Sequence, residues 1–103
     1  MNQRFLHIIN STKPVLVDFY TDWCGPCKEV PAILKEVKQD FKGHVRIVKV
    51  NVDRNPYIAS RYKISSVPTL MVFKKGTLLW KTEGVCNADE LKSVVRKQIQ
   101  EEN

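Results

Sequence analysis

Residues 15–28, VLVDFYTDWCGPCK, hold the features that decide the fold of this 103-residue chain. The first six are almost continuously apolar, a pattern typical of a strand covered on both faces, and Asp18 is the single exception. Two cysteines, Cys24 and Cys27, follow within a few residues, and apolar residues then recur at helical spacing. The stretch therefore predicts a buried strand, a cysteine pair at a helix start, and a helix.

The rest of the chain continues this alternation of strand and helix patterns. The expected elements are a short helix over 4–10, strand 15–20, a helix from the cysteines to about Gly43, strand 45–52, a helix from Asn55-Pro56 to about Tyr62, strands 69–73 and 77–83, and a helix that starts at Asn87. A strand–helix–strand crossover implies a parallel pair, and the turn at Lys74-Lys75-Gly76 implies an antiparallel hairpin. We expect one α/β domain over residues 1–103, with a mixed central sheet flanked by helices on both faces.

Asparagines precede the last two predicted helices. Asn55 stands directly before Pro56, and Asn87 stands three residues before Glu90, an arrangement similar to a capping box. Both asparagines are predicted to cap their helices, with Pro56 at the first helical position.

The net charge of +6 comes from 17 basic residues scattered along the chain, with Lys74-Lys75 as the longest basic run. A nucleic-acid site needs basic residues gathered on one face, so nucleic-acid binding is not expected. Diffuse positive charge favours acidic protein surfaces instead. No apolar run reaches the ~20 residues that span a membrane, and the N-terminus lacks the features of a signal peptide. We expect a cytoplasmic protein that does not contact membranes.

Three cysteines are an odd number, which argues against a fully paired disulfide framework. A Cys-x-x-Cys pair can be half of a zinc site or an incidental spacing, but no second Cys-x-x-Cys or His pair completes four ligands. Its place at a predicted helix start favours redox chemistry, because free N–H groups there stabilise a thiolate. Cys24 is the expected nucleophile, and Cys27, one turn further on, is the expected resolving thiol.

Residues 17–28 resemble the active-site stretch of the thioredoxin family. The similarity continues through KVNVD at 49–53, VPT at 67–69 and Lys75-Gly76 to Gly84, in matching order over most of the chain. The resemblance implies the thioredoxin fold and a protein-disulfide reductase.

The resemblance also implies how such a reaction proceeds. Cys24 attacks a disulfide in a partner protein, and Cys27 releases the reduced product, which leaves a Cys24–Cys27 disulfide. Gly25-Pro26 between the cysteines is similar to the pair found in reducing members of the family rather than in oxidising ones.

Other residues take roles from the same resemblance. Asp18 matches the family's buried acid, which assists proton transfer at Cys27, and Lys49 matches the lysine that approaches this acid. Pro68 matches the family's cis-proline, and Val67 matches the residue whose backbone binds a peptide. The apolar patch that accepts substrates is implied to comprise Trp23, Gly25, Pro26, Gly84 and Val85.

The implied redox group is the Cys24–Cys27 disulfide itself, with no bound cofactor and no metal. Electrons are implied to come from NADPH through a flavin-containing thioredoxin reductase, and to pass to disulfide-containing proteins. Two alternatives stay open: a dedicated electron donor or isomerase for one partner, and a binding subunit that rarely turns over. A monomer is expected, with a dimer as the alternative.

The sequence departs from the family pattern at several points. Only about ten residues precede Ser11, so the family's first edge strand is expected to be missing. Pro31 stands four rather than five residues after Cys27, which is expected to shift the proline kink in the helix, and Tyr20 replaces a tryptophan. Cys86, beside the patch, is either a small buried hydrophobe or a regulatory thiol.

Two of the implied site residues also have ordinary structural explanations. Asp18 can be a hydrogen-bonded or partly exposed carboxylate rather than a functional acid. Lys49, in an alternating strand, is as readily solvated as paired with Asp18. If burial raises the pKa of Asp18, its ionised form opposes folding unless Lys49 compensates.

Overall fold

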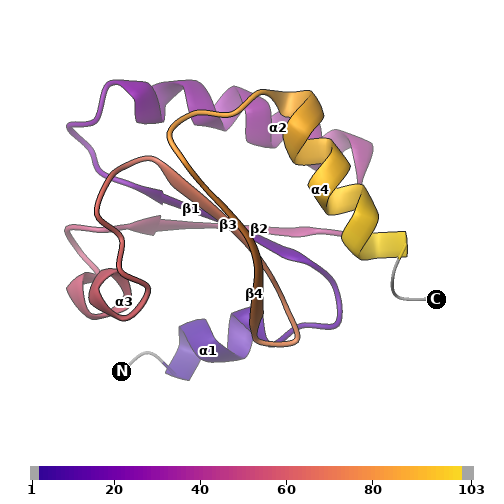
Figure 1. Ribbon diagram of the computed structural model, residues 1–103, viewed down its shortest axis with the longest axis horizontal. Helices are drawn as coiled ribbons and strands as arrows, with labels where there is room; N and C mark the ends of the chain where they lie inside the picture. Colours follow the sequence, from indigo (N-terminus) through magenta and orange to yellow (C-terminus); the bar gives the residue numbers. More distant parts are fainter. Residues whose placement is uncertain (1–2, 101–103) are drawn as a thin grey trace.

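A mixed four-stranded sheet forms the centre of the computed structural model, which describes residues 3–100 (Figure 1). The elements in chain order are α1 (Gln3–Ile9), β1 (Val15–Tyr20), the 3-10 turn η1 (Pro26–Glu29), α2 (Val30–Asp40), β2 (Arg46–Asn51), α3 (Pro56–Arg61), β3 (Thr69–Lys74), β4 (Thr77–Glu83) and α4 (Ala88–Gln100). The strand order is β2-β1-β3-β4. β1 pairs with β2 in parallel, whereas β3 pairs with both β1 and β4 in antiparallel. The predicted α/β fold with a mixed sheet is confirmed; residues 1–2 and 101–103 of the predicted domain lie outside the described residues.

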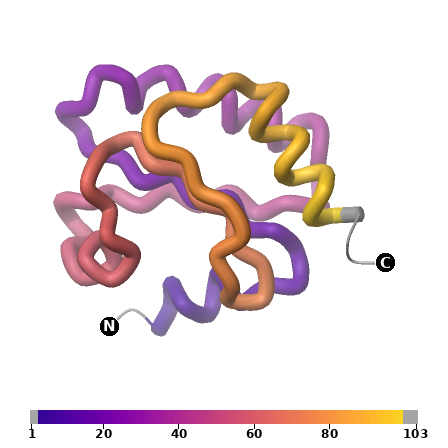
Figure 2. Tube along the Cα trace, viewed as in Figure 1, coloured from indigo at the N-terminus to yellow at the C-terminus, as the bar shows by residue number. Residues whose placement is uncertain are grey.

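Helices cover both faces of the sheet, as predicted. α2 and α4 lie side by side on one face, and α1 and α3 lie on the other (Figures 1 and 2). Successive strand residues point to opposite faces, so the sheet contributes to two separate cores. The core under α1 and α3 contains Phe5, Ile9, Val15, Val17, Phe19, Val50, Ile58, Met71 and Phe73. The core under α2 and α4 contains Leu16, Val30, Leu34, Val37, Leu70, Val72, Cys86, Leu91 and Val95.

Asp18 lies on the α2 face of β1, because it shares the direction of Leu16 rather than that of Val17. The nearly continuous apolar run around it follows from β1 being central, with a neighbouring strand on each side and helices on each face. The acid therefore belongs to one of the two central strands of the sheet, and the chain runs from the end of this strand to the cysteines.

One edge of the sheet is open, as expected if the first edge strand of the family is missing. Within residues 3–100, β2 pairs with β1 alone, and α1 precedes β1. β2 is also the more exposed of the two parallel strands, since only its last two residues are buried.

The helix after the cysteines differs from the expectation. It opens as the short turn η1, and α2 begins only at Val30, so Pro31 is the second residue of α2. The first-turn N–H groups of a helix have no partner within it, so proline there removes no α-helical bond. The prediction of a proline kink inside the helix was wrong for this reason.

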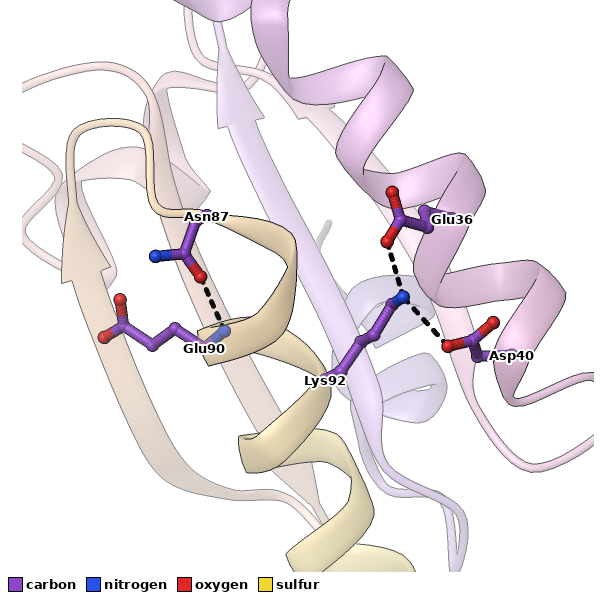
Figure 3. Close-up of polar contacts among 5 residues, drawn as sticks. All are labelled: Glu36, Asp40, Asn87, Glu90 and Lys92. Carbon is purple, nitrogen blue, oxygen red and sulfur yellow. Dashed lines mark hydrogen bonds and ion pairs between the residues drawn. The ribbon is translucent and has the colours of Figure 1, made fainter.

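The two asparagine caps have different outcomes. Asn87 accepts a hydrogen bond from the backbone N–H of Glu90 at 2.8 Å, which confirms the predicted cap of α4 (Figure 3). Asn55 makes no such bond, although Pro56 does stand at the start of α3. The Asn55 amide instead donates to the backbone carbonyl of Asn51 at 2.9 Å, and this competing local bond explains why the prediction was wrong.

An ion-pair cluster joins the two helices on one face. Lys92 of α4 lies 2.5 Å from the Glu36 carboxylate and 2.9 Å from that of Asp40, both on α2 (Figure 3). Hydrogen bonds to Glu36 and Asp40 raise the pKa of Lys92 above its ordinary value. The cluster adds a polar contact between α2 and α4 outside the apolar core.

Candidate functional site

The two cysteines of the motif form a disulfide between β1 and α2. The Cα atoms of Cys24 and Cys27 lie 5.3 Å apart, and both residues are buried. The backbone N–H of Cys27 points at the sulfur of Cys24, with 3.1 Å between N and Sγ. A donor at this position stabilises negative charge on the Cys24 sulfur when the disulfide is opened.

The surroundings of the two sulfurs differ. Cys24 Sγ lies 3.6 Å from the carbonyl oxygen of Val67, in the loop before β3. The peptide bond between Val67 and Pro68 is cis, as the resemblance implied. Cys27 instead lines a partly open cavity of about 200 Å³ that Asp18 also lines. One sulfur therefore adjoins a surface loop and the other an enclosed acid.

Asp18 is almost fully enclosed, with 1% of its surface exposed. Its Oδ1 atom has no hydrogen-bond partner among the described residues, so the satisfied-carboxylate explanation does not hold for this atom. Burial raises the pKa of Asp18 to about 6 from its ordinary 3.8, and the charge of Lys49 offsets part of this effect. An acid with such a pKa exchanges protons near neutral pH.

Lys49 stands opposite Asp18 in the parallel register of β1 and β2. Its side chain is exposed, and its Nζ lies 5.7 Å from the centre of the Tyr20 ring. It also lines the cavity that holds Asp18 and Cys27. Lys49 is therefore both solvated and close to Asp18. Its charge lowers the pKa of Asp18, although the two side chains form no ion pair within residues 3–100.

The residues implied to form a substrate patch include the chain neighbours of Cys24, and most of them are exposed. Trp23 is 74% exposed, Val85 is exposed, and Gly25 and Pro26 are exposed as well. Gly84 has a φ of +91°, a backbone conformation that favours glycine, and its N–H donates to the carbonyl of Pro68 at 2.8 Å. A hollow of about 300 Å³ adjoins the patch and is lined by Thr21, Trp23, Val52, Asp53, Ile64, Ser65, Ser66 and Val67.

Cys86 is placed apart from the disulfide pair. It is buried in the core under α2 and α4, with Val72, Leu91 and Val95 in the same cluster. Burial, with a smaller contribution from Glu90, raises the pKa of the Cys86 thiol. The thiol form therefore dominates at neutral pH, which suits a buried hydrophobe better than a reactive cysteine.

Sequence reasoning missed two polar residues of the site. Thr21 is buried, lines the cavity of Asp18 and Cys27, and its Oγ1 has no hydrogen-bond partner among the described residues. Asp53 accepts a hydrogen bond from the indole N–H of Trp23 at 2.9 Å, which orients the exposed ring. The only sequence signals were that an indole N–H needs an acceptor and that Thr21 lies between the buried acid and the cysteines.

Neither a metal cluster nor a membrane-spanning helix appears within residues 3–100. No three His, Cys, Asp or Glu side chains in that range come together as ligands. None of the helices in the same range has both the length and the apolar character needed to cross a bilayer.

Comparisons with known proteins agree with this geometry. The family model described as thioredoxin matches residues 1–97. The chain is 41% identical over 92 residues to thioredoxin 1 of Nostoc sp. and 42% identical over 92 residues to thioredoxin 1 of Chlorobaculum tepidum. These matches cover 89% of this chain and 86% and 91% of the two relatives.

Solved structures give the same result. The oxidised form of mitochondrial thioredoxin 3 from Saccharomyces cerevisiae is 33% identical, with a TM-score of 0.81 over 91% of this chain and 87% of the other. A second structure with a TM-score of 0.81 and 32% identity comes from work on the thiol resolving mechanism of yeast mitochondrial 1-Cys peroxiredoxin through the glutathione and thioredoxin systems. It covers the same shares of the two chains. The chain therefore belongs to the thioredoxin family, and its redox-active Cys24–Cys27 pair makes it a protein-disulfide reductase.

Proposed function

We propose that the protein reduces disulfides in partner proteins by a division of labour between its two cysteines. Cys24 attacks the partner, and Cys27 completes the exchange. The observation that carries this proposal is the contrast between the sulfurs: Cys24 adjoins Val67 and the exposed patch, whereas Cys27 lines the cavity of Asp18.

The first step needs a thiolate on the exposed side of the pair. The Cys24 thiolate attacks one sulfur of the partner's disulfide, so a mixed disulfide forms and the other partner sulfur leaves as a thiolate. The Cys27 N–H, 3.1 Å from Cys24 Sγ in the oxidised protein, supports the charge on Cys24 before the attack.

The second step needs a proton acceptor on the inner side. Cys27 must lose its proton before its sulfur attacks Cys24 and releases the second partner thiolate. Asp18, with a pKa of about 6, is mostly ionised at pH 7 and can take that proton across the cavity that the two residues share. Two electrons thus pass to the partner, and the Cys24–Cys27 disulfide remains.

The exposed patch would seat the partner. An extended segment can hydrogen-bond to the backbone of Val67, while apolar side chains rest on Trp23 and Val85. The carbonyl oxygen of Val67 lies 3.6 Å from Cys24 Sγ, so a segment bound there would lie beside the attacking sulfur. Gly25, Pro26 and Gly84 keep the surface low around the sulfur, since none of them projects a long side chain.

Electrons would return to the pair from NADPH through a flavin-containing thioredoxin reductase. A reductase role requires a compartment in which the pair can be kept reduced, and the cytoplasm predicted from the sequence meets this requirement. The yeast structure studied with a 1-Cys peroxiredoxin supports thiol peroxidases as one class of electron acceptor.

Insulin reduction tests this proposal. We expect the wild-type protein to turn over with either dithiothreitol or NADPH plus a thioredoxin reductase as the electron source, and Cys24→Ser to have no turnover with either. Cys86→Ala is the matched control and should keep activity within about twofold, because Cys86 lies in the core. Turnover by Cys24→Ser at the wild-type rate would refute the proposal, and full biological activity of that variant would favour the binding-subunit alternative. The dithiothreitol arm separates a wrong mechanism from a mismatched reductase.

A further inference from the structure

The strand β2 leaves backbone hydrogen-bonding groups at the open edge of the sheet. The N–H of Arg46 donates to Pro14 at 3.0 Å, and the N–H of Val52 likewise points to the β1 side. Because backbone groups alternate in direction along a strand, those of Ile47 and Lys49 point away from β1. Within residues 3–100 no strand lies beyond β2, so this edge can accept one.

The same edge gathers positive charge. The cavity of Asp18, which Asp22 also lines, reaches Lys49 of β2. Three other hollows, of about 510, 400 and 320 Å³, adjoin β2, and no acidic side chain within residues 3–100 lines them. Their basic lining residues, all exposed, are Arg4, Lys13, Lys35, Lys38, Arg46 and Lys49. None of these six forms an ion pair in the part of the chain that the structure describes. Six of the 17 basic residues of the chain therefore line hollows beside this edge of the sheet.

The open backbone edge of β2 and the basic side chains beside it together restrict which kind of molecule can bind there. A second copy of the chain would bring two sets of these positive charges together, which opposes pairing of β2 with itself. A nucleic acid would meet the charge but has no peptide groups to pair with Ile47 and Lys49. An extended peptide that carries carboxylates satisfies both the backbone groups and the charge.

We propose that β2 binds an extended segment rich in Asp and Glu, from a partner protein, as an added strand of the sheet. The segment pairs with the backbone of Ile47 and Lys49, and its carboxylates meet the six basic side chains. Docking there leaves the patch around Trp23 and Val85 open. This binding does not depend on the redox step, so it is tested separately from it.

The test is binding of fluorescent ten-residue peptides to the oxidised wild-type protein, followed by anisotropy. The first peptide alternates Glu and Val, the second has the same five Glu but five prolines placed at both even and odd positions, and the third has Lys in place of every Glu. Prolines at both even and odd positions remove backbone donors from each edge of the peptide, so neither edge can pair fully with β2. A ten-nucleotide single strand serves as the nucleic-acid probe.

Two protein variants distinguish an effect of the charges beside β2 from an effect of the total charge of the protein. Lys38→Gln/Arg46→Gln removes two charges beside β2, and Lys81→Gln/Lys97→Gln removes two from β4 and α4. We expect the Glu-Val peptide to bind at least about tenfold more tightly than the proline and Lys peptides. The first variant should weaken that binding about three- to tenfold, and the second less than twofold. Addition of the Glu-Val peptide should shift the amide resonances of Ile47 and Lys49 in particular.

Several results would overturn the inference. Equal binding of the Glu-Val and proline peptides, or equal losses in the two variants, would reduce the effect to diffuse charge. Tighter binding of the oligonucleotide would replace the peptide as occupant. A dimer in sedimentation equilibrium that the Lys38→Gln/Arg46→Gln variant strengthens would assign the edge to a second copy.

Discussion

The Cys24–Cys27 pair and Cys86 have nearly the same exposure, yet their surroundings give them different chemistry. The exposed fractions are 5%, 6% and 8% in chain order. Cys24 has a backbone donor and a surface loop beside it, and Cys27 has an acid and a cavity. Cys86 has apolar side chains that raise its pKa. From this comparison we expect neighbouring polar groups, rather than exposure, to determine which of the three cysteines react.

The largest expected difference lies in alkylation of the fully reduced protein. At pH 7, iodoacetamide should label Cys24 about a thousandfold faster than Cys86, because the Cys86 thiol is both protonated and packed in the core. Mass spectrometry of peptides from timed samples gives the two rates. Similar rates for the two cysteines would break the comparison.

Asp18→Asn is expected to stabilise the oxidised protein at neutral pH. The folded-state pKa of Asp18 is raised to about 6 from 3.8, so the folded protein binds the proton more tightly than the unfolded chain. Stability is therefore lost as pH rises through this window, by about 2–3 kcal/mol at pH 7. Asparagine carries no charge and should recover most of that amount in urea unfolding.

The pH dependence makes this prediction specific. The gain from Asp18→Asn should fall below about 1 kcal/mol at pH 4, where Asp18 is largely protonated in the folded protein. Asp89→Asn, at an exposed position in the first turn of α4, is the matched control and should give no gain at either pH. An Asp18→Asn variant no more stable than wild type at pH 7 would show that the cavity does not penalise the charge.

Thr21→Val should have a smaller effect on the same cavity. The Thr21 hydroxyl is buried and has no hydrogen-bond partner within residues 3–100, and valine replaces it with a methyl group of similar size. We expect a gain of about 1 kcal/mol in unfolding free energy, because an unsatisfied buried hydroxyl is removed. The measurement is urea unfolding beside wild type. A loss of 1 kcal/mol or more would mean that the hydroxyl makes a stabilising bond, with an ordered water as the partner.

The elements that sequence reasoning predicted well are those set by local pattern. The apolar run of β1 and the hairpin turn at Lys74-Lys75-Gly76 placed their strands within one residue. Asn87 capped its helix as predicted because, within residues 3–100, no other donor bonds to its side-chain oxygen. The cysteine pair was recognisable because its three-residue spacing is a local property.

The features that sequence reasoning missed depend on contacts between distant segments. Asp53 reaches Trp23 from 30 positions away, and no local pattern indicates this bond. The basic residues beside β2 are scattered in the sequence. Arg4 and Lys49, for example, line the same hollow only because α1 packs beside β2. The predicted cap at Asn55 was wrong for a local reason, because the Asn55 amide donates to the backbone carbonyl of Asn51 instead.

Trapping of a mixed disulfide tests the central claim, that Cys24 attacks and Cys27 resolves. Cys27→Ser, reduced and mixed with oxidised insulin, should accumulate a covalent adduct that mass spectrometry maps to Cys24. Cys24→Ser under the same conditions should accumulate much less, because the remaining sulfur of the pair is buried beside Asp18. An adduct on Cys86, or equal adducts with the two variants, would contradict the assignment.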